Sequence, residues 1–201
     1  MTKIIGLTGG IASGKSTVSN LLRLAGYPIV DADQIVHQLQ SAQSKGLAKL
    51  ATAFGNQILN PDQTLNRQKL GSIVFGDQEK LTKLNEIMQP LIREEIWRQV
   101  DNYKKQQLPY VILDIPLLFE ANYASDCDQV IVVYVDRSTE IQRLMQRNGY
   151  SREEAEQRID AQMPLEEKKG LADIVINNNG DEDHLKQQVA KLIDNMQDYN
   201  L

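Results

Sequence analysis

The chain has 201 residues, 41% hydrophobic and 24% charged, so it holds enough apolar material for a core without disulfides or a structural metal. Its net charge is −5 and no block of lysines or arginines stands out, which argues against a nucleic-acid binder. The single cysteine, Cys127, excludes an internal disulfide and is expected to be a small buried hydrophobe. No targeting segment or membrane-length apolar run is visible, so we expect a cytoplasmic protein, and a monomer.

The first expected strand, residues 3–7, leads into a glycine-rich phosphate-binding motif. Residues 9–16 match the pattern G-x-x-x-x-G-K-[ST]. Its glycines permit backbone angles and a close approach that a Cβ would forbid, and its N–H groups and the next helix's N-terminus can hold phosphates. Lys15 would reach the β- and γ-phosphates, and the Ser16 hydroxyl would be a ligand for Mg²⁺. The motif predicts nucleotide binding by Gly10, Ile11, Ala12, Ser13, Gly14, Lys15, Ser16 and Thr17.

A second expected strand, residues 28–30, is followed directly by two carboxylates, Asp31 and Asp33. In a parallel sheet this is the edge at which the phosphate motif also lies and ligands bind. The carboxylates could orient an acceptor hydroxyl or hold Mg²⁺ through water. One of them could instead cap a helix that begins near Ile35. The two roles are compatible, and we favour a catalytic role for at least one carboxylate.

The middle of the chain combines a helical stretch with the third expected strand. Residues 35–106 show helical periodicity and no convincing strand, so we predict a helical insertion. The third strand, residues 110–113, is followed by Asp114, where P-loop enzymes place an aspartate associated with Mg²⁺. A strand-end turn promoted by Pro116 is the alternative for this residue.

The fourth expected strand, residues 129–135, precedes a segment rich in charges of both signs, residues 137–170. Arg143 and Arg147 are four residues apart on one face of a helix expected over 138–149. Arginines on a closing segment can stabilise charge on a transferring phosphoryl group. A solvated ion-pair surface that includes Glu140 explains the spacing equally well.

A fifth expected strand, residues 173–176, and a final helix complete the alternation of strands and helices. The pattern predicts an α/β fold: a P-loop NTPase core with a five-stranded parallel sheet flanked by helices. A GTPase is disfavoured, because Asn177–Gly180 is no guanine-reading motif and Asp114 starts no DxxG switch. A small core with an insertion and a lid is typical of nucleotide-type kinases, which must exclude water. We assign the nucleotide-binding core to residues 1–34, 107–136 and 171–201, the acceptor-binding insertion to 35–106 and the lid to 137–170.

Segments along nearly the whole chain resemble the dephospho-coenzyme A kinase family. The most particular are Asp-Ala-Asp at residues 31–33 and Asp-Ile-Pro-Leu-Leu-Phe-Glu at residues 114–120; the others are residues 5–10, 65–67, 70–71, 143–147, 162–164 and 172–177. The resemblance implies transfer of the γ-phosphoryl group of ATP to the ribose 3′-hydroxyl of dephospho-coenzyme A, with Mg²⁺.

The resemblance also implies roles for individual residues. Catalysis would rest on Lys15, Asp33 and Arg147. Arg143 would join the phosphate motif in binding the nucleotide. The metal ligands would be Ser16 and Asp114. The acceptor would be bound by Thr8, Asp31, Asp33, Arg67 and Leu118.

Two positions depart from the family pattern. Ala12 stands where many members carry glycine, which the backbone should tolerate if its φ is negative. Gln89 stands where the family commonly has histidine, so no role is transferred to it. Two alternative functions stay open: another small-metabolite or nucleoside kinase of the same fold, and an ATP-binding regulatory module without catalysis. The intact set of Lys15, Ser16, Asp33, Asp114 and Arg147 argues against the regulatory module.

Overall fold

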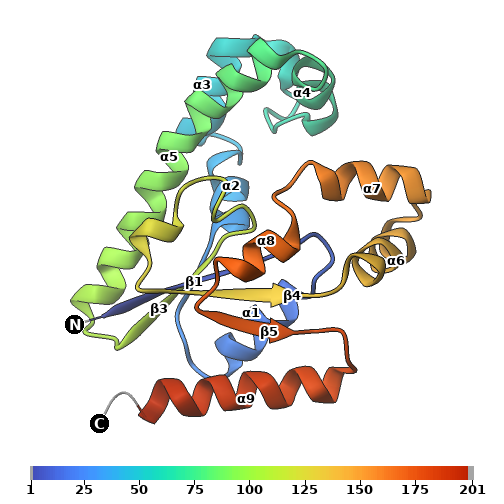
Figure 1. Cartoon of the computed structure of the whole chain (residues 1–201). Helices are drawn as coiled ribbons and strands as arrows, with labels where there is room; N and C mark the ends of the chain where they lie inside the picture. Colours follow the sequence, from blue (N-terminus) through green and yellow to red (C-terminus); the bar gives the residue numbers. More distant parts are fainter. Residues whose placement is uncertain (1, 199–201) are drawn as a thin grey trace. The chain divides into compact units, whose positions relative to one another are not determined.

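The computed structural model describes residues 2–198, and the chain divides into two compact units (Figure 1). The core unit comprises the residues up to Val30 and those from Tyr103 onward. The helical unit comprises Asp31–Asn102. The lid predicted for residues 137–170 lies within the core unit.

The core unit is built on a five-stranded sheet in the order β2-β3-β1-β4-β5. The central strand β1 pairs in parallel with β3 and β4, and β4 pairs in parallel with β5. Residues along the central strands are buried on both faces, as expected where helices cover a parallel sheet on both sides. The predicted five-stranded sheet flanked by helices is confirmed; its strands are β1 (Lys3–Gly9), β2 (Ile29–Asp31), β3 (Tyr110–Asp114), β4 (Gln129–Tyr134) and β5 (Ile174–Asn177).

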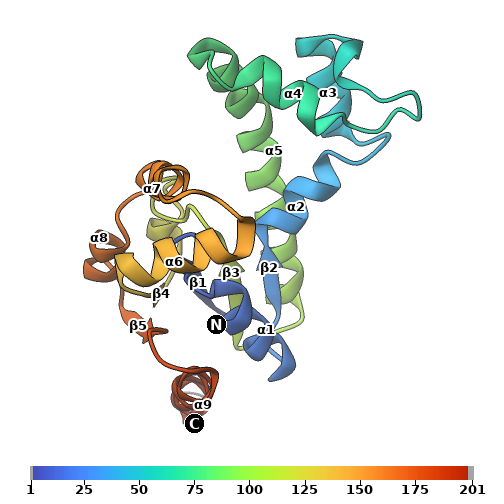
Figure 2. The ribbon, with the colours of Figure 1, turned by 90° about the vertical axis from the view of Figure 1, so that its right-hand side faces the viewer.

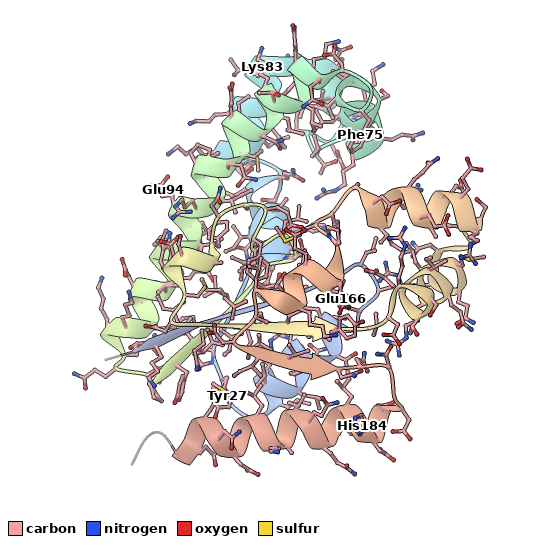
Figure 3. All side chains as sticks on the ribbon, in the orientation of Figure 1. Tyr27, Phe75, Lys83, Glu94, Glu166 and His184 are labelled. Atoms are coloured by element: carbon pink, nitrogen blue, oxygen red, sulfur yellow. The ribbon has the colours of Figure 1, made fainter. Side chains whose placement is uncertain are left out.

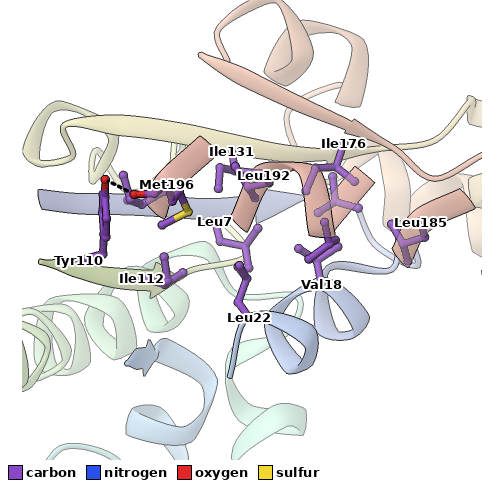
Figure 4. Close-up of a cluster of buried hydrophobic side chains, with 13 residues drawn as sticks. Leu7, Val18, Leu22, Tyr110, Ile112, Ile131, Ile176, Leu185, Leu192 and Met196 are labelled. Carbon is purple, nitrogen blue, oxygen red and sulfur yellow. Dashed lines mark hydrogen bonds between the residues drawn. The ribbon is translucent and has the colours of Figure 1, made fainter. Parts of the chain in front are cut away.

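One face of the sheet is covered by α1 (Lys15–Leu24) and α9 (Glu182–Asp198). Figure 4 shows their buried side chains packed against those of the strands. The Tyr110 hydroxyl donates a 2.8 Å hydrogen bond to the Met196 carbonyl, which satisfies a polar group inside this cluster. Val18 and Leu22 have no exposed surface, so the helix that follows the phosphate motif is fixed to the sheet through its apolar face.

The predicted lid forms three helices, α6 (Arg137–Asn148), α7 (Arg152–Asp160) and α8 (Leu165–Gly170), drawn in orange in Figure 1. Helix α7 begins with a capping box, because the Ser151 hydroxyl accepts from the Glu154 N–H while the Glu154 carboxylate accepts from the Ser151 N–H. Helix α6 ends at Gly149, which has φ +70°. A second apolar cluster joins α6 to α7 through Ile141, Leu144, Ala155 and Ile159.

The helical unit contains α2 (Ala32–Leu39), α3 (Lys45–Phe54), a 3₁₀ turn η1 (Asn56–Ile58), α4 (Arg67–Val74) and most of α5 (Gln78–Lys105), as Figure 2 shows. The side chains of Asp31, Ser44 and Asn66 cap the N-termini of α2, α3 and α4, respectively. In this unit, an isolated bridge between Leu59 and Leu65 is the β pairing that the structure describes. The expectation of helices without a strand therefore matches these residues.

At the edge strand β5, a side chain of α9 forms hydrogen bonds with the backbone of the last residue of the strand. The Gln188 side-chain carbonyl accepts a 3.0 Å hydrogen bond from the Asn177 N–H, and its amide N–H donates a 2.6 Å bond to the Asn177 carbonyl. Nearby, His184 is exposed on the first turn of α9 (Figure 3). Of the helices within residues 2–198, none is long and apolar enough to span a membrane.

Candidate active site

The phosphate motif forms a loop between β1 and α1. Gly14 precedes α1 with φ +94°, a conformation that L side chains rarely adopt. The loop closes through a 3.2 Å hydrogen bond from the Ser13 N–H to the Gly10 carbonyl. The first N–H groups of α1 follow directly, so backbone donors gather where a phosphate chain would bind.

Ala12 has φ +61°, so the negative φ at which alanine would be tolerated without strain is not found at this position. An L residue in the left-handed region is strained by roughly 1–2 kcal/mol. The Ala12 methyl group packs, together with Ile11, against the cluster that joins α6 to α7. This packing attaches the phosphate loop to helices α6 and α7.

Lys15 and Asp114 form an ion pair at the carboxyl ends of β1 and β3. The Lys15 ammonium donates to the Asp114 carboxylate, and the two side chains are 16% and 5% exposed. Asp114 lies opposite Leu7 in the sheet register, so the strand pairing itself places this carboxylate beside the phosphate loop. The structure thus brings together two predicted site residues that are 99 positions apart.

Asn178 is a site residue that the sequence analysis missed. It is only 7% exposed, and its side-chain N–H donates a 2.8 Å hydrogen bond to the Ser13 carbonyl of the phosphate loop. A Cβ on Gly14 would lie 2.2 Å from that amide nitrogen, so Gly14 is required for the close approach. The run of three asparagines at the end of β5, residues 177–179, was the available signal.

The two predicted arginines differ in their surroundings. The Arg143 guanidinium donates a 2.9 Å hydrogen bond to the Asn178 carbonyl, which ties α6 to the loop that supports the phosphate motif. Arg147 is exposed and donates to the side chain of its neighbour Asn148. Arg143 is therefore fixed beside the loop, whereas Arg147 is a surface side chain of α6.

A buried polar network links the lid to the segment after β3. The Pro116 carbonyl accepts from the Thr8 hydroxyl at 2.9 Å and from the Lys168 ammonium at 3.3 Å. Lys168 has no exposed surface and pairs with the Glu120 carboxylate at 2.8 Å, which also accepts from the Met163 N–H. A buried ammonium needs such partners, so this network fixes α8 on the segment that begins with Asp114.

Two residues predicted to bind the acceptor have no exposed surface. Leu118 is a core residue, and a Cβ on Gly6 would lie 2.6 Å from its Cδ1 atom. The Thr8 hydroxyl is occupied by its bond to Pro116. Their contact with an acceptor stays a prediction based on the resemblance.

Glu140 is buried with only 3% of its surface exposed, so the alternative interpretation of a solvated ion-pair surface that includes Glu140 is wrong. Its carboxyl group packs on Gly10, since a Cβ at that glycine would lie 2.1 Å from Glu140 Oε1. Burial raises the pKa of the Glu140 carboxyl to about 7. A carboxyl that titrates near neutral pH thus contacts the phosphate loop.

In the helical unit, Asp31 accepts a 3.0 Å hydrogen bond from the Gln34 N–H and caps α2. The helix therefore begins at Ala32, before the expected start near Ile35. Asp33 lies in the first turn of α2 and is exposed. Asp31 thus has the helix-capping role that was considered for one of the two carboxylates.

Arg67 contacts α2 within the same unit. Its guanidinium donates to the Gln40 side-chain carbonyl at 2.6 Å and lies 3.3 Å from His37 Nδ1. Asp33 and His37 are four residues apart on α2 and share a face of the helix. His37 was not predicted to lie near Arg67; its position one turn beyond Asp33 was the signal in the sequence.

Cys127 is partly buried, and the pKa of its thiol is raised to about 12. Burial is the larger cause, and the nearby negative charges of Asp126 and Asp128 raise the pKa further. Such a thiol stays protonated and unreactive at neutral pH. This environment agrees with an expected role in packing.

The parallel sheet and the glycine-rich loop before α1 define a kinase of the P-loop α/β class. The fold is shared with a shikimate kinase from Acinetobacter baumannii, at a TM-score of 0.52 and 13% identity, over 100% of this chain and 96% of that chain. A family model described as dephospho-CoA kinase matches residues 3–184. The chain belongs to the dephospho-CoA kinase family, and its activity is the last step of coenzyme A biosynthesis, in agreement with the prediction.

Relatives support this assignment over almost the full chain. The dephospho-CoA kinase of Bacillus cereus is 48% identical over 195 residues, which cover 97% of this chain and 98% of the relative. The dephospho-CoA kinase of Oceanobacillus iheyensis is 47% identical over 193 residues, 96% of this chain and 97% of the relative. Among solved structures, the dephospho-CoA kinase from Campylobacter jejuni has a TM-score of 0.77 at 30% identity and covers 100% of both chains.

Proposed function

We propose that the chain transfers the γ-phosphoryl group of ATP to the ribose 3′-hydroxyl of dephospho-coenzyme A. The acceptor oxygen forms the new bond to phosphorus, the bond to the ADP oxygen breaks, and the hydroxyl proton is released. The observation that carries the proposal is the Lys15–Asp114 pair at the end of the phosphate loop. It provides a cation for the phosphates and a carboxylate beside them, the two charges that phosphoryl transfer needs.

In this proposal the phosphate loop binds the donor through its backbone N–H groups, with Lys15 exchanging its carboxylate partner for phosphate oxygens. Arg143 is held on the loop after β5 and supports the nucleotide side. Arg147 is exposed on the same helix and is proposed to approach the transferring group. Because phosphoryl transfer has a loose transition state, positioning these charges is the main catalytic contribution.

Mg²⁺ fits the donor set, as the proposed ligands are the Ser16 hydroxyl and the Asp114 carboxylate. Among the residues that the structure describes, no group of three or more histidine, cysteine or acidic side chains could hold a metal. Mg²⁺ commonly uses one or two protein ligands together with substrate phosphates and water, so the sparse set suits it. When bound, the ion would neutralise charge on the phosphates.

On the acceptor side, Asp33 is proposed to align the ribose hydroxyl and accept its proton, and Arg67 to contact acceptor phosphates. Support comes from the exposure of Asp33 on the first turn of α2 and from the contacts of Arg67 with the same helix. The cytoplasmic location and the monomeric state stay predictions of the sequence.

The test is ADP release by purified protein with ATP and Mg²⁺, comparing dephospho-coenzyme A with no acceptor, adenosine and nucleoside monophosphates. ADP release that requires dephospho-coenzyme A and falls by about 10²-fold or more in Asp33→Asn supports the proposal. Asp101→Asn, an exposed carboxylate on α5, serves as the matched control and should retain activity. Turnover with a nucleotide instead would exclude the substrate, and ATP binding without any turnover would favour the regulatory module.

A further inference from the structure

The contact between Glu140 and Gly10 joins the lid to the phosphate loop. Glu140 lies on the first turns of α6, while Gly10 lies between β1 and the loop. The space beside Gly10 is filled, because a Cβ on this residue would lie 2.1 Å from Glu140 Oε1 and 3.0 Å from Leu165 Cδ2 of α8. Gly10 is thus packed against both the Glu140 carboxyl group of α6 and the Leu165 side chain of α8.

The charges around Glu140 come from all three lid helices. Arg137 of α6 and Lys168 of α8 favour its ionised form, while Asp160 of α7 disfavours it. Both cations already have acidic partners, since Arg137 pairs with Asp160 at 2.8 Å and Lys168 pairs with Glu120. Within residues 2–198, no hydrogen bond to the Glu140 carboxyl is found. Desolvation therefore outweighs the attraction, and the neutral form is favoured by its surroundings.

Nucleotide phosphates would add negative charge on the same loop. A carboxylate in contact with Gly10 repels such charge, and burial reduces the screening by salt. A protonated carboxyl of the same shape does not repel it. The two events are linked: if the proton favours phosphate binding, phosphate binding favours the proton to the same degree.

We propose that Glu140 is a positioning residue of the phosphate loop that supports nucleotide binding in its protonated form, so that nucleotide binding is accompanied by proton uptake from solvent at this carboxyl. The inference rests on nucleotide binding by the phosphate loop, which is part of the proposed function. It adds a dependence on pH that neither the motif nor the family assigns.

The test is isothermal titration calorimetry with Mg·ADP, in two buffers of different ionisation enthalpy, on the full chain and on Glu140→Gln. Because ADP itself titrates near neutral pH, the difference between the two proteins isolates the carboxyl. If binding raises its pKa by about one unit, the wild type takes up about half a proton more at pH 7.5. Its dissociation constant also rises about sixfold more than that of the variant between pH 6.5 and 8.5.

The control is Glu153→Gln, the same chemical change at an exposed position of α7, which should behave as the wild type. Equal proton uptake and equal pH profiles in wild type and Glu140→Gln would overturn the role of Glu140 while leaving nucleotide binding intact. Absence of Mg·ADP binding in the wild type would instead overturn the proposed function and this inference with it. Weaker binding of Glu140→Gln at every pH, with unchanged proton uptake, would indicate a purely structural contact.

Discussion

Replacing Glu140 by glutamine should stabilise the fold, and the gain should grow with pH. The carboxyl has an ordinary pKa of 4.5, and burial raises it to about 7 in the folded protein. A difference of 2.5 in pKa, at about 1.36 kcal/mol per unit, corresponds to about 3 kcal/mol of destabilisation once the group is ionised.

The sign follows from which state binds the proton more tightly. Below pH 4.5 the group is protonated in both states and contributes no penalty. Between pH 4.5 and 7 the unfolded chain releases the proton first, so stability falls as pH rises, and above pH 7 the penalty is complete. Glutamine has the same shape and no charge, so the variant avoids this loss.

The assay is urea unfolding of wild type and Glu140→Gln at pH 5 and at pH 8.5. The free energy of unfolding of the variant, relative to the wild type, should increase by about 2–3 kcal/mol between the two pH values. A constant offset from the new amide does not affect this comparison. A difference that is independent of pH, or that shrinks as pH rises, would refute the reasoning, and Glu153→Gln should show no pH-dependent difference.

Two further substitutions test the contacts that surround the phosphate loop. Gly10→Ala places a Cβ 2.1 Å from Glu140 Oε1 and should lower the free energy of unfolding by about 1–3 kcal/mol. In a Glu140→Ala background the cost of Gly10→Ala should fall by at least about 1 kcal/mol. An equal cost in both backgrounds would contradict the contact between the two residues. Lys168→Met leaves the Glu120 carboxylate without its buried partner and should lower the free energy of unfolding by about 2–4 kcal/mol, measured in thermal or urea unfolding. Lys186→Met breaks an exposed ion pair and should change that free energy little. Similar effects of the two substitutions would show that the buried pair is not stabilising.

The strands and the phosphate loop were predictable because their signals are local. Each strand is a short apolar run with β-branched residues, and all five were expected within two residues of their observed ends. The loop is a contiguous motif whose residue types are fixed by the chemistry of phosphate binding. The start of α2 at Ala32 was expected three residues late, since either of two nearby aspartates could cap it.

The remaining site residues depend on contacts between distant parts of the chain. Asn178 reaches a carbonyl 165 positions away, which no local pattern reveals. The charge spacing of α6 is compatible with an exposed helix, whereas Glu140 is buried and contacts Gly10, a residue 130 positions away in the phosphate loop. The positive φ of Ala12 is imposed by closure of the loop and not by the preference of alanine.

The side chain of Gln188 pairs with the edge of the sheet in the same way as one residue of an additional strand would. Its amide occupies both backbone groups of Asn177, the last residue of the edge strand β5. A strand from another molecule could not form hydrogen bonds with Asn177 at the end of β5, because both backbone groups of this residue are already paired. Edge strands are common starting points for aggregation and domain swapping, and natural proteins protect them in several ways. In this chain a glutamine from the last helix provides that protection, without a charge, a proline or a bulge.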